Sequence, residues 1–298
     1  MSPSASVIIP TYDRADILGD SIRSVLNQTY EDLELIVVDD ASTDETDEVV
    51  RGFNDDRIKY LRHTENKGAP AARNTGIAES EGDFVAFQDS DDVWSRTKLE
   101  KQLRVFRQTS NDVGVVYTGM VRIIDGERRY IPYPSVEQTE GHVCRSLSRQ
   151  NFVPTQVATV RRECFDEVGY FDENVWPISD WELWIRISKR FQFKLVDEPL
   201  VTGEVRSDSI SKNAREKVKA RKRIVEKHRE FFDEASLARQ LFYIGHGFMK
   251  LGETSRGRAY LKQAVQVEPN ARRVGALLLS VLGSNAYHGM YRYYTRNS

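Results

Sequence analysis

Short apolar runs alternate with amphipathic segments along the first 90 residues. The runs that suit buried strands cover residues 6–9, 33–38, 58–61 and 84–87. Between them, apolar residues recur at helical spacing, which predicts helices near residues 17–26, at 45–53 with Asp44 as its cap, and at 69–79. We expect Pro10 to close the first strand. This alternation predicts an α/β fold with a mostly parallel central sheet and helices on both faces.

Polar and acidic residues follow three of the predicted strands. They are Pro10-Thr11-Tyr12, then Asp39-Asp40, then Asp89-Ser90-Asp91-Asp92. Ligands of parallel sheets bind outside the carboxyl ends of the strands, so we expect an aromatic ring and five carboxylates around one crevice. Crowded carboxylates repel unless a cation neutralises them, and oxygen ligands suit Mg²⁺ or Mn²⁺. Taken alone, residues 89–92 also fit an acidic turn in which Asp92 caps a helix beginning near Lys98.

Glycine-rich phosphate cradles are absent from the sequence. There is no G-x-G-x-x-G after the first strand and no G-x-x-x-x-G-K-[ST] anywhere. If a nucleotide binds at the predicted edge, a metal ion and basic side chains must neutralise its phosphates. Lys67 and Arg73 are the nearest basic candidates.

Four motifs in a fixed order carry a resemblance to a known family. They are Val7-Ile8-Ile9-Pro10-Thr11-Tyr12, Val37-Val38-Asp39-Asp40-Ala41-Ser42-Thr43-Asp44, Asn66-Lys67-Gly68 with Ala72-Arg73-Asn74, and Asp89-Ser90-Asp91-Asp92. Over roughly residues 5–205 the chain resembles the family 2 glycosyltransferases of the GT-A fold. The resemblance implies a Rossmann-like nucleotide-binding half. It also implies transfer of a sugar from a nucleotide-diphospho-sugar, a UDP-sugar in first place, with inversion at the anomeric carbon.

The resemblance also implies roles for single residues. Thr11 and Tyr12 would line the base pocket, and Asp39 or Asp40, with Asp40 preferred, would accept a hydrogen bond from the base. The full nucleotide-sugar-binding set is Pro10, Thr11, Tyr12, Asp39, Asp40, Lys67, Arg73, Asp89 and Ser90. The metal set, for Mg²⁺ or Mn²⁺, is Asp91, Asp89 and Asp92.

A catalytic base is implied in the second half of the domain. In residues 178–186 the position of the base is taken by Asp180, while Ser179 replaces the usual first acid. Inverting transfer requires a carboxylate that takes the proton from the acceptor hydroxyl as it attacks. Asp180 also fits the N-cap of an amphipathic helix over 181–190, and the two roles are compatible.

Other chemistry-bearing residues give weaker signals. We expect Trp184 to pack in the core, whereas Trp181 fits either the core or stacking on a sugar. The five histidines lack metal-ligand spacing, so we expect them to be packed or solvated. Arg206 follows the last strand and is a candidate for a phosphate contact, although a solvated loop is the favoured interpretation.

The charge of the chain divides it into two parts. The 298 residues carry a formal net charge of −2, and 40% of them are hydrophobic, as in globular proteins. Residues 1–211 carry 25 Lys and Arg against 38 Asp and Glu, whereas 212–298 carry 18 against seven. We therefore predict a GT-A domain over 1–211 and a basic helical region over 212–298, whose partner is an anionic surface.

Three segments make up the predicted helical region. Residues 212–230 fit a basic helix, and 238–271 fit one tetratricopeptide-type helix pair, or equally a plain helical hairpin, with Gly257 where Ala is usual. Residues 272–298 combine a short apolar run with Arg272, Arg273 and several tyrosines. This pattern fits an interfacial membrane helix, and a helix that packs back on the repeat is the alternative.

The remaining composition bears on location and partners. Two cysteines in no disulfide or zinc pattern, no room for a signal peptide and no apolar run of ~20 residues predict a cytoplasmic protein, with a peripheral position on the cytoplasmic membrane face held open. The expected partners are a nucleotide-sugar donor and a glycan or polyprenyl-phosphate-linked acceptor, and no nucleic acid. The alternative is a non-catalytic nucleotide-sugar-binding or scaffolding protein that acts through its helical tail.

Overall fold

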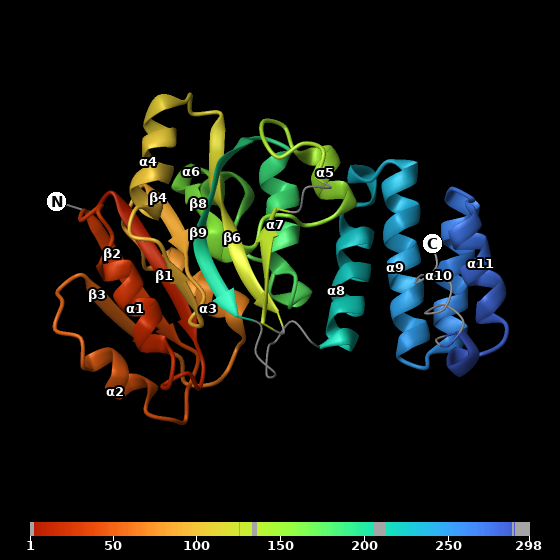
Figure 1. Ribbon diagram of the computed structural model, residues 1–298, viewed down its shortest axis with the longest axis horizontal. Helices are drawn as coiled ribbons and strands as arrows, with labels where there is room; N and C mark the ends of the chain where they lie inside the picture. The colour runs from red at the N-terminus through yellow and green to blue at the C-terminus, as the bar shows by residue number, and fades with distance from the viewer. Residues whose placement is uncertain (1–2, 125, 133–135, 205–212, 288, 290–298) are drawn as a thin grey trace. The chain divides into compact units, whose positions relative to one another are not determined.

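The computed structural model describes residues 3–124, 126–132, 136–204, 213–287 and 289 (Figure 1). The chain divides into two compact units. The first is Met1–Leu147 with Asn151–Glu173 and Asp180–Ser207, and the second is Ser148–Gln150 with Asn174–Ser179 and Asp208–Ser298. The predicted boundary between residues 211 and 212, like Arg206, lies outside the described residues, so it stays a prediction.

A sheet of nine strands, counted over the described residues, forms the centre of the first unit. Its first half is parallel, in the order β3-β2-β1-β4, and is built from β1 (Ala5–Thr11), β2 (Leu33–Asp39), β3 (Ile58–Arg62) and β4 (Phe84–Phe87). β1, β2 and most of β4 are buried because apolar residues occupy both of their faces. The prediction of a mostly parallel sheet flanked by helices is confirmed (Figure 1).

The second half of the sheet is mixed. It continues from β4 through β8 (Ala158–Arg161), β6 (Val113–Ile124), β9 (Gln192–Glu204) and β5 (Asp92–Trp94), with β7 (Glu127–Ile131) paired to β6. The long pair β6 and β9 is parallel, whereas β8 is antiparallel to both of its neighbours. β5 joins the far edge by pairing antiparallel with β9, which fixes the residues directly after the acidic run.

Helices and 3₁₀ turns connect these strands. They are α1 (Leu18–Leu26), α2 (Thr46–Arg51), α3 (Ala69–Ala78), α4 (Lys98–Gln108), α5 (Cys144–Arg149), α6 (Arg162–Val168) and α7 (Ser179–Ser188), with the turns η1 (Thr155–Val157) and η2 (Glu173–Val175). α1 forms as the spacing predicts, because Leu18, Ile22 and Val25 are fully buried on one face. α3 begins after Gly68, whose φ of 89° suits glycine, and has Pro70 in its first turn.

One expectation about local structure is wrong, and one alternative is excluded. The first strand does not close at Pro10, since Pro10 pairs with Val38 of β2 and the strand continues to Thr11. Proline is tolerated there because the pairing of β1 with β4 ends at Ile8, so the missing N–H faces no strand partner on that side. Asp92 does not cap a helix: it begins β5, and Thr97 is the N-cap residue of α4.

The second unit is helical. Its elements are α8 (Ala214–Lys227), the 3₁₀ turn η4 (Arg229–Phe231), α9 (Glu234–Lys250), α10 (Thr254–Val267) and α11 (Ala271–Ser280). α9 and α10 approach closely at two glycines, because a Cβ at Gly245 would lie 2.9 Å from the carbonyl oxygen of Gly257. A Cβ at Gly257 would in turn lie 2.7 Å from Met249 Sδ. This close packing explains why glycine stands where the repeat pattern suggests alanine.

Residues 272–298, predicted to form an interfacial membrane helix, include a tyrosine that packs inside the second unit. Tyr287 is fully buried and its hydroxyl lies 2.9 Å from His246 Nδ1, so it packs on α9. Leu278, Val281 and Leu282 are exposed. The remaining tyrosines and basic residues of the prediction, from 291 to 296, lie outside the described residues. None of the helices in the described part of the chain combines the length and apolar character that crossing a membrane requires.

Candidate active site

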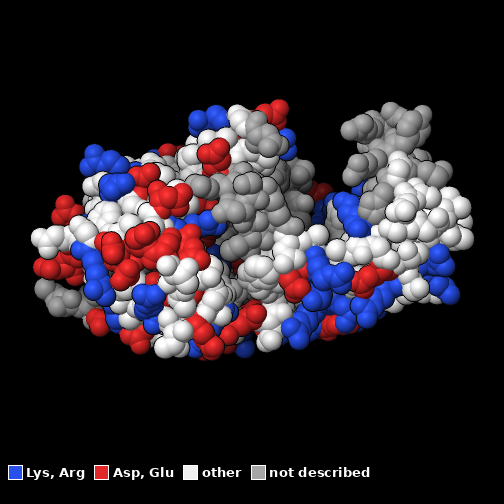
Figure 2. All heavy atoms as spheres, turned by 90° about the horizontal axis from the view of Figure 1, so that it is seen from below, with Lys and Arg blue, Asp and Glu red and all other residues white. Residues whose placement is uncertain are grey.

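Three strand ends lie side by side at the carboxyl edge of the parallel half-sheet. β1 lies between β2 and β4, and Thr11 pairs with Asp39 in register. The backbone N–H of Asp40 donates to the carbonyl of Thr11 (2.8 Å), which joins the two ends one residue further on. Figure 2, which views the molecule from below, shows Asp and Glu gathered over the first unit on the face where these strands end. We call this edge the strand-end site.

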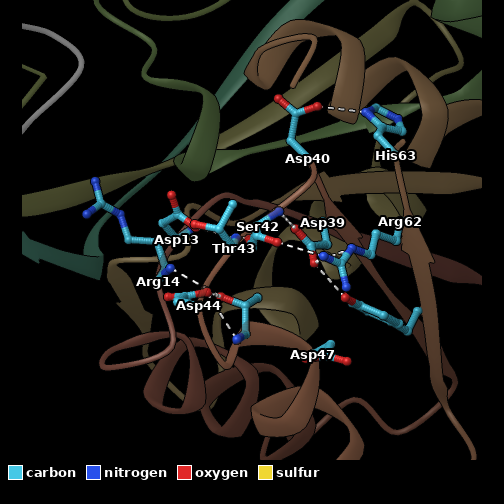
Figure 3. Close-up of polar contacts among 12 residues, drawn as sticks. Asp13, Arg14, Asp39, Asp40, Ser42, Thr43, Asp44, Asp47, Arg62 and His63 are labelled. Carbon is cyan, nitrogen blue, oxygen red and sulfur yellow. Dashed lines mark hydrogen bonds and ion pairs between the residues drawn. The ribbon is translucent and has the colours of Figure 1, made fainter. Parts of the chain in front are cut away.

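Asp39 builds the turn after β2. Its carboxylate is completely buried and accepts a hydrogen bond from the backbone N–H of Ser42 (2.7 Å), as Figure 3 shows. The carboxylate also accepts a hydrogen bond from the hydroxyl of Tyr60 (2.6 Å). Arg62 adds an ion pair at 3.7 Å. Its oxygens are buried and already have hydrogen-bond donors within the protein. Asp39 therefore holds the backbone of the turn in place.

Asp40 is oriented toward the start of α3. It accepts hydrogen bonds from the backbone N–H groups of Lys67 (2.9 Å) and Gly68 (2.6 Å). Figure 3 shows its Oδ1 directed at His63, whose Nδ1 lies 2.7 Å away. The other ring nitrogen of His63 lies 2.9 Å from Thr75 Oγ1. A carboxylate can accept about four hydrogen bonds, so these three leave one acceptor position on Asp40.

Tyr12 is the exposed ring of the site, with 43% of its surface accessible. Asp13 raises the pKa of its hydroxyl above the ordinary value, and Asp40 adds to this effect, whereas a hydrogen bond with Asn66 lowers it. Its neighbours Pro10 and Thr11 are buried in β1, and Lys67 is exposed beyond them. Tyr12 therefore lies within reach of both the Asp40 carboxylate and the loop before α3.

The acidic run after β4 is a tight turn held from behind by α1. Ser21 Oγ donates to the carbonyls of Asp89 (3.0 Å) and Asp92 (2.6 Å), and Gln88 Nε2 also donates to the carbonyl of Asp92 (2.5 Å). Ser90 is buried within the turn. The backbone of the run is therefore fixed, while its carboxylates point in different directions.

Asp89, Asp91 and Asp92 have different surroundings. Asp89 pairs with Arg73 at 2.8 Å. Asp92 is buried against β9, opposite Gly203, and the side chain of Gln156 hydrogen bonds to it. Burial raises the pKa of Asp92 well above its usual range, and Asp89 and Asp91 raise it further.

Asp91 is the half-buried member of the run. Burial and the nearby Asp89 carboxylate raise its pKa, while Arg14 and Arg122 act in the opposite direction. Among the described residues, no three His, Cys, Asp or Glu side chains are arranged to hold a metal ion. However, Mg²⁺ is commonly held by one or two carboxylates together with substrate phosphates. Asp91 with Asp89 fits such a partial site, whereas Asp92 faces the sheet.

Asp180 belongs to the same electrostatic system. It lies in the first turn of α7, where its carboxylate accepts hydrogen bonds from Asn151 Nδ2 (2.9 Å) and the backbone N–H of Trp181 (2.8 Å). Burial raises its pKa; Arg73 lowers it and Asp89 raises it. Arg73 thus acts on both carboxylates and connects the acidic run with α7.

The tryptophans near Asp180 belong to the core. Trp184 is fully buried, as expected, and donates from Nε1 to the carbonyl of Val153 (2.7 Å). Trp181 was ambiguous from sequence, and it is also buried, with its Nε1 donating to the carbonyl of Leu147 (2.8 Å). Since neither ring is exposed, stacking of Trp181 on a sugar is not supported.

Three residues of this arrangement escaped the sequence analysis, namely His63, Arg14 and Arg122. Asn151 and Gln156 belong to the segment 151–156, which from sequence is expected to shape the acceptor side, but neither residue has an individual role predicted. His63 follows directly after β3, the strand next to β2. Its position at a strand end could have identified it as a residue of the site. The others come from β6, from η1 or from segments outside the strands, and no local pattern connects them with the acidic run.

Comparison with known proteins decides the family. The family model described as "Glycosyl transferase family 2" matches residues 6–169, more than half of the chain. The chain belongs to this family. The resemblance inferred from the four motifs is therefore confirmed.

Relatives with assigned names match over part of their length. Escherichia coli WfgD, named a UDP-Glc:alpha-D-GlcNAc-diphosphoundecaprenol beta-1,3-glucosyltransferase, is 44% identical over 112 residues, which cover 38% of this chain and 44% of WfgD. One uncharacterized glycosyltransferase is 36% identical over 68% of this chain, and the match spans 29% of its own length. A second uncharacterized glycosyltransferase is 37% identical over 60% of this chain, and the match spans 56% of its own length.

Solved structures share the fold. Staphylococcus aureus TarS 1-349 in complex with UDP-GlcNAc is similar with a TM-score of 0.70, covering 100% of this chain and 93% of that chain at 20% identity. The mannosyltransferase PcManGT from Pyrobaculum calidifontis, in complex with GDP-Man and Mn2+, has a TM-score of 0.60, covering 97% and 86% at 18% identity. These likenesses confirm the GT-A fold.

Proposed function

We propose that this glycosyltransferase moves a sugar from a nucleotide-diphospho-sugar to a hydroxyl of a glycan or lipid-linked acceptor, with inversion at the anomeric carbon. The observation that carries the proposal is the pair of carboxylates on which Arg73 acts. Asp89 lies at the strand-end site, where open α/β sheets bind nucleotides, and Asp180 lies on α7 within the influence of the same guanidinium. A donor site and a base for the acceptor would thus be adjacent.

The donor would bind along the three strand ends. Tyr12 would stack on the base, and Asp40 would accept a hydrogen bond from it through its remaining acceptor position. Arg73 and Lys67 would neutralise the phosphates. Asp89 would contact the ribose once the donor draws Arg73 away from it. Pro10, Thr11, Asp39 and Ser90, which are all buried, would line the site.

Asp180 would act as the general base. Its raised pKa places the carboxyl closer to the pKa range in which proton transfer at physiological pH is efficient. The hydrogen bonds from Asn151 and from the backbone N–H of Trp181 would hold one oxygen each, and an acceptor position that remains on the carboxylate could face the acceptor hydroxyl. The proton would pass from that hydroxyl to the carboxylate as the new glycosidic bond forms.

A divalent cation would complete the donor site. Asp91 would be its principal ligand with Asp89 as the second, whereas Asp92 would act from the second layer through its packing on β9. When bound, Mg²⁺ or Mn²⁺ would neutralise the charge of the leaving nucleoside diphosphate. The fit of the carboxylate oxygens and the Mn2+ in the structure of PcManGT both support this assignment.

The named relatives favour particular substrate classes. TarS was crystallised with UDP-GlcNAc, and WfgD is named for a UDP-sugar donor and a diphosphoundecaprenol-linked acceptor. We therefore propose a UDP-sugar as donor and a polyprenyl-diphosphate-linked glycan as acceptor, in the assembly of a surface or protein-linked glycan. Such an acceptor would require the enzyme to work at the cytoplasmic face of a membrane.

Residues 272–298 would contribute to membrane contact. Within their described part, Leu278, Val281 and Leu282 form an exposed apolar edge, which suits the interfacial region of a bilayer. In this proposal, the domain over 1–211 would carry out catalysis and the helical region over 212–298 would provide membrane contact. Truncation after Pro269 should weaken sedimentation with anionic liposomes, and unchanged sedimentation would remove this part of the proposal.

A screen of nucleotide-sugars tests the donor site. Wild-type protein and Asp91→Ala would be titrated calorimetrically with UDP-, GDP- and dTDP-sugars, each with Mn²⁺ and with EDTA. We expect one donor class to bind in the presence of the metal, and Asp91→Ala to lose at least about tenfold in affinity. Equal affinity of both proteins with and without metal would contradict the role of Asp91. Absence of any donor binding would favour the scaffolding alternative.

A further inference from the structure

A pocket of about 270 Å³ in the helical unit is lined by arginines. Its walls come from the segment 148–150, from the first half of α9 and from the start of α11. The charged and aromatic lining residues are Arg149, Arg239, Arg272, Arg273, Phe242 and Tyr243. Among the described lining residues there is no Asp or Glu, so four positive charges converge on a small volume.

Two of the arginines are held at the start of α11. The Arg272 guanidinium lies 5.2 Å from the centre of the Phe242 ring, a distance at which a cation–π contact fixes its orientation. Arg273 is 8% exposed, donates to the carbonyl of Glu268 (2.7 Å) and pairs with the Glu268 carboxylate. Its backbone N–H donates to Asn270 Oδ1 (2.8 Å), which caps the helix. The charge of Arg273 is thus paired with a carboxylate of its own unit.

A buried glutamine holds the opposite wall. Gln240 has no exposed surface and donates through Nε2 to the carbonyls of Ser148 (2.8 Å) and Arg149 (2.9 Å). Its Oε1 accepts a hydrogen bond from Arg221, whose guanidinium lies 5.2 Å from the Tyr243 ring centre. This chain of contacts fixes the backbone that carries Arg149 relative to α9.

The surroundings of Arg221 add to the positive charge. Burial lowers its pKa to about 10, and the nearby Arg239 contributes in the same direction, although Tyr243 opposes it. Arg221 still carries its charge at neutral pH. A fifth cation therefore lies behind the pocket wall, and an anion in the pocket would relieve the repulsion among these groups.

We infer that this arginine pocket binds a phosphate-class anion, a phosphomonoester or diphosphate carried by a soluble molecule or by a lipid headgroup. Guanidinium groups present two N–H donors in a plane and so match phosphate oxygens better than ammonium groups do. The volume is below the range of about 300–1,000 Å³ usual for whole drug-sized ligands, so it suits a headgroup and not an entire nucleotide-sugar. The inference goes beyond the proposed function and does not depend on it, because every lining residue belongs to the helical unit.

Titration of the full-length protein with defined anions tests the inference. The probes are inorganic phosphate, pyrophosphate, and vesicles of phosphatidylglycerol, with phosphatidylcholine vesicles for comparison. The test protein is Arg239→Gln/Arg272→Gln. The matched control is Arg256→Gln, which removes an exposed arginine of the same unit that pairs with Glu253 outside the pocket. We expect a loss of at least about tenfold in the double variant and wild-type affinity in the control.

The donor site could also bind diphosphates. Only the part of the binding that the double variant loses is therefore assigned to the arginine pocket. If the double variant does not fold, Arg239→Lys/Arg272→Lys replaces it, and we expect weaker binding because the paired donors are lost while the charge stays. Donor binding at the strand-end site, measured separately, should stay unchanged in both variants, so failure of either proposal can be recognised by itself.

Each outcome distinguishes the sources or overturns the inference. Binding of pyrophosphate without retention on phosphatidylglycerol vesicles would identify a soluble phosphate compound. Retention on those vesicles that pyrophosphate reverses would identify a lipid headgroup. No binding of any probe to the wild type would overturn the inference, and so would equal binding by the wild type and the glutamine or lysine double variant.

Discussion

The strand-end site and the arginine pocket hold charges of opposite sign, and they hold them by different means. Asp39 accepts a hydrogen bond from the backbone N–H of Ser42, three residues further on, and Asp40 accepts hydrogen bonds from the backbone N–H groups of Lys67 and Gly68 in the loop before α3. In the pocket, long arginine side chains lie against rings such as Phe242. Carboxylates on strand ends are therefore positioned closely by the backbone, which suits chemistry at defined atoms. Stacked arginines supply charge that tolerates ligands of varied shape.

The two regions also differ in how they can be neutralised. Burial and mutual repulsion raise the pKa values of Asp91 and Asp92, so the acidic run is relieved by a proton or a cation. Arginines stay charged over the whole physiological range, so the pocket is relieved only by an anion. Changes at the strand-end site should therefore affect transfer, and changes in the pocket should affect binding of anions.

Asp180→Asn should have the largest effect on the first region. The amide cannot accept the acceptor's proton, so we expect kcat to fall by about 10²–10⁴-fold while the dissociation constant of the donor stays near that of the wild type. Single-turnover transfer and calorimetric donor binding, measured on the same preparation, check both parts. Retention of full transfer activity would exclude Asp180 as the base. Anion binding by the arginine pocket serves as the control and should not change.

Gly203→Ala should have the next largest effect. A Cβ at this position would overlap Asp92 Oδ1 across the β5–β9 pair, so either the strand or the acidic turn must move. We expect a loss of about 1–3 kcal/mol in the free energy of unfolding, together with weaker metal-dependent donor binding. Chemical denaturation and calorimetry measure the two effects.

Gly275→Ala is the matched control for this substitution. No atom lies within 4 Å of a Cβ at Gly275, which lies within α11 of the helical unit. Alanine should therefore stabilise the helix by about 1 kcal/mol or less and leave donor binding unchanged. If both substitutions destabilised the protein equally, the packing of Asp92 against β9 would not account for the effect.

Asn151→Ala should give the smallest effect, a shift in pH dependence. The hydrogen bond from Asn151 favours the ionised form of Asp180, so its removal should raise the pKa of this already raised carboxyl further. Since the base must be ionised, acidification should abolish transfer at a higher pH in the variant than in the wild type. Profiles of kcat/KM against pH measure the shift. Asn213→Ala, which removes the N-cap of α8, should leave the acid limb in place.

The sequence predicted the parallel half of the sheet because periodicity is local. The apolar runs of β1, β2 and β4 are buried on both faces, and a run of this kind forms a strand wherever helices cover it. The strand order then brought the motif-bearing ends together, as the rule for open α/β sheets predicts. Asp40, Arg73 and Asp89 could thus be assigned to one edge before any contact was known.

The mixed half of the sheet could not be predicted in the same way. β5 is three residues long, and its residues read as a turn until β9 pairs with them from more than a hundred residues away. The local sequence also fits a helix cap at Asp92, but the pairing of β5 with β9 makes it a buried strand residue. The packing of Trp181 and Tyr287 was likewise decided by groups distant in sequence, Leu147 and His246.

The sequence by itself determined which carboxylates lie at strand ends, because the residue pattern that predicts a strand is local and does not depend on tertiary packing. Only the tertiary structure decided their partners, such as Arg73 for Asp89 and His63 for Asp40, and it likewise gave Asn151 to Asp180 on α7. It alone also gathered Arg149 from one segment with Arg239 and Arg272 from two others. The physical reason is range, since strand and helix periods act over a few residues, whereas pairing of charges depends on where the folded chain returns.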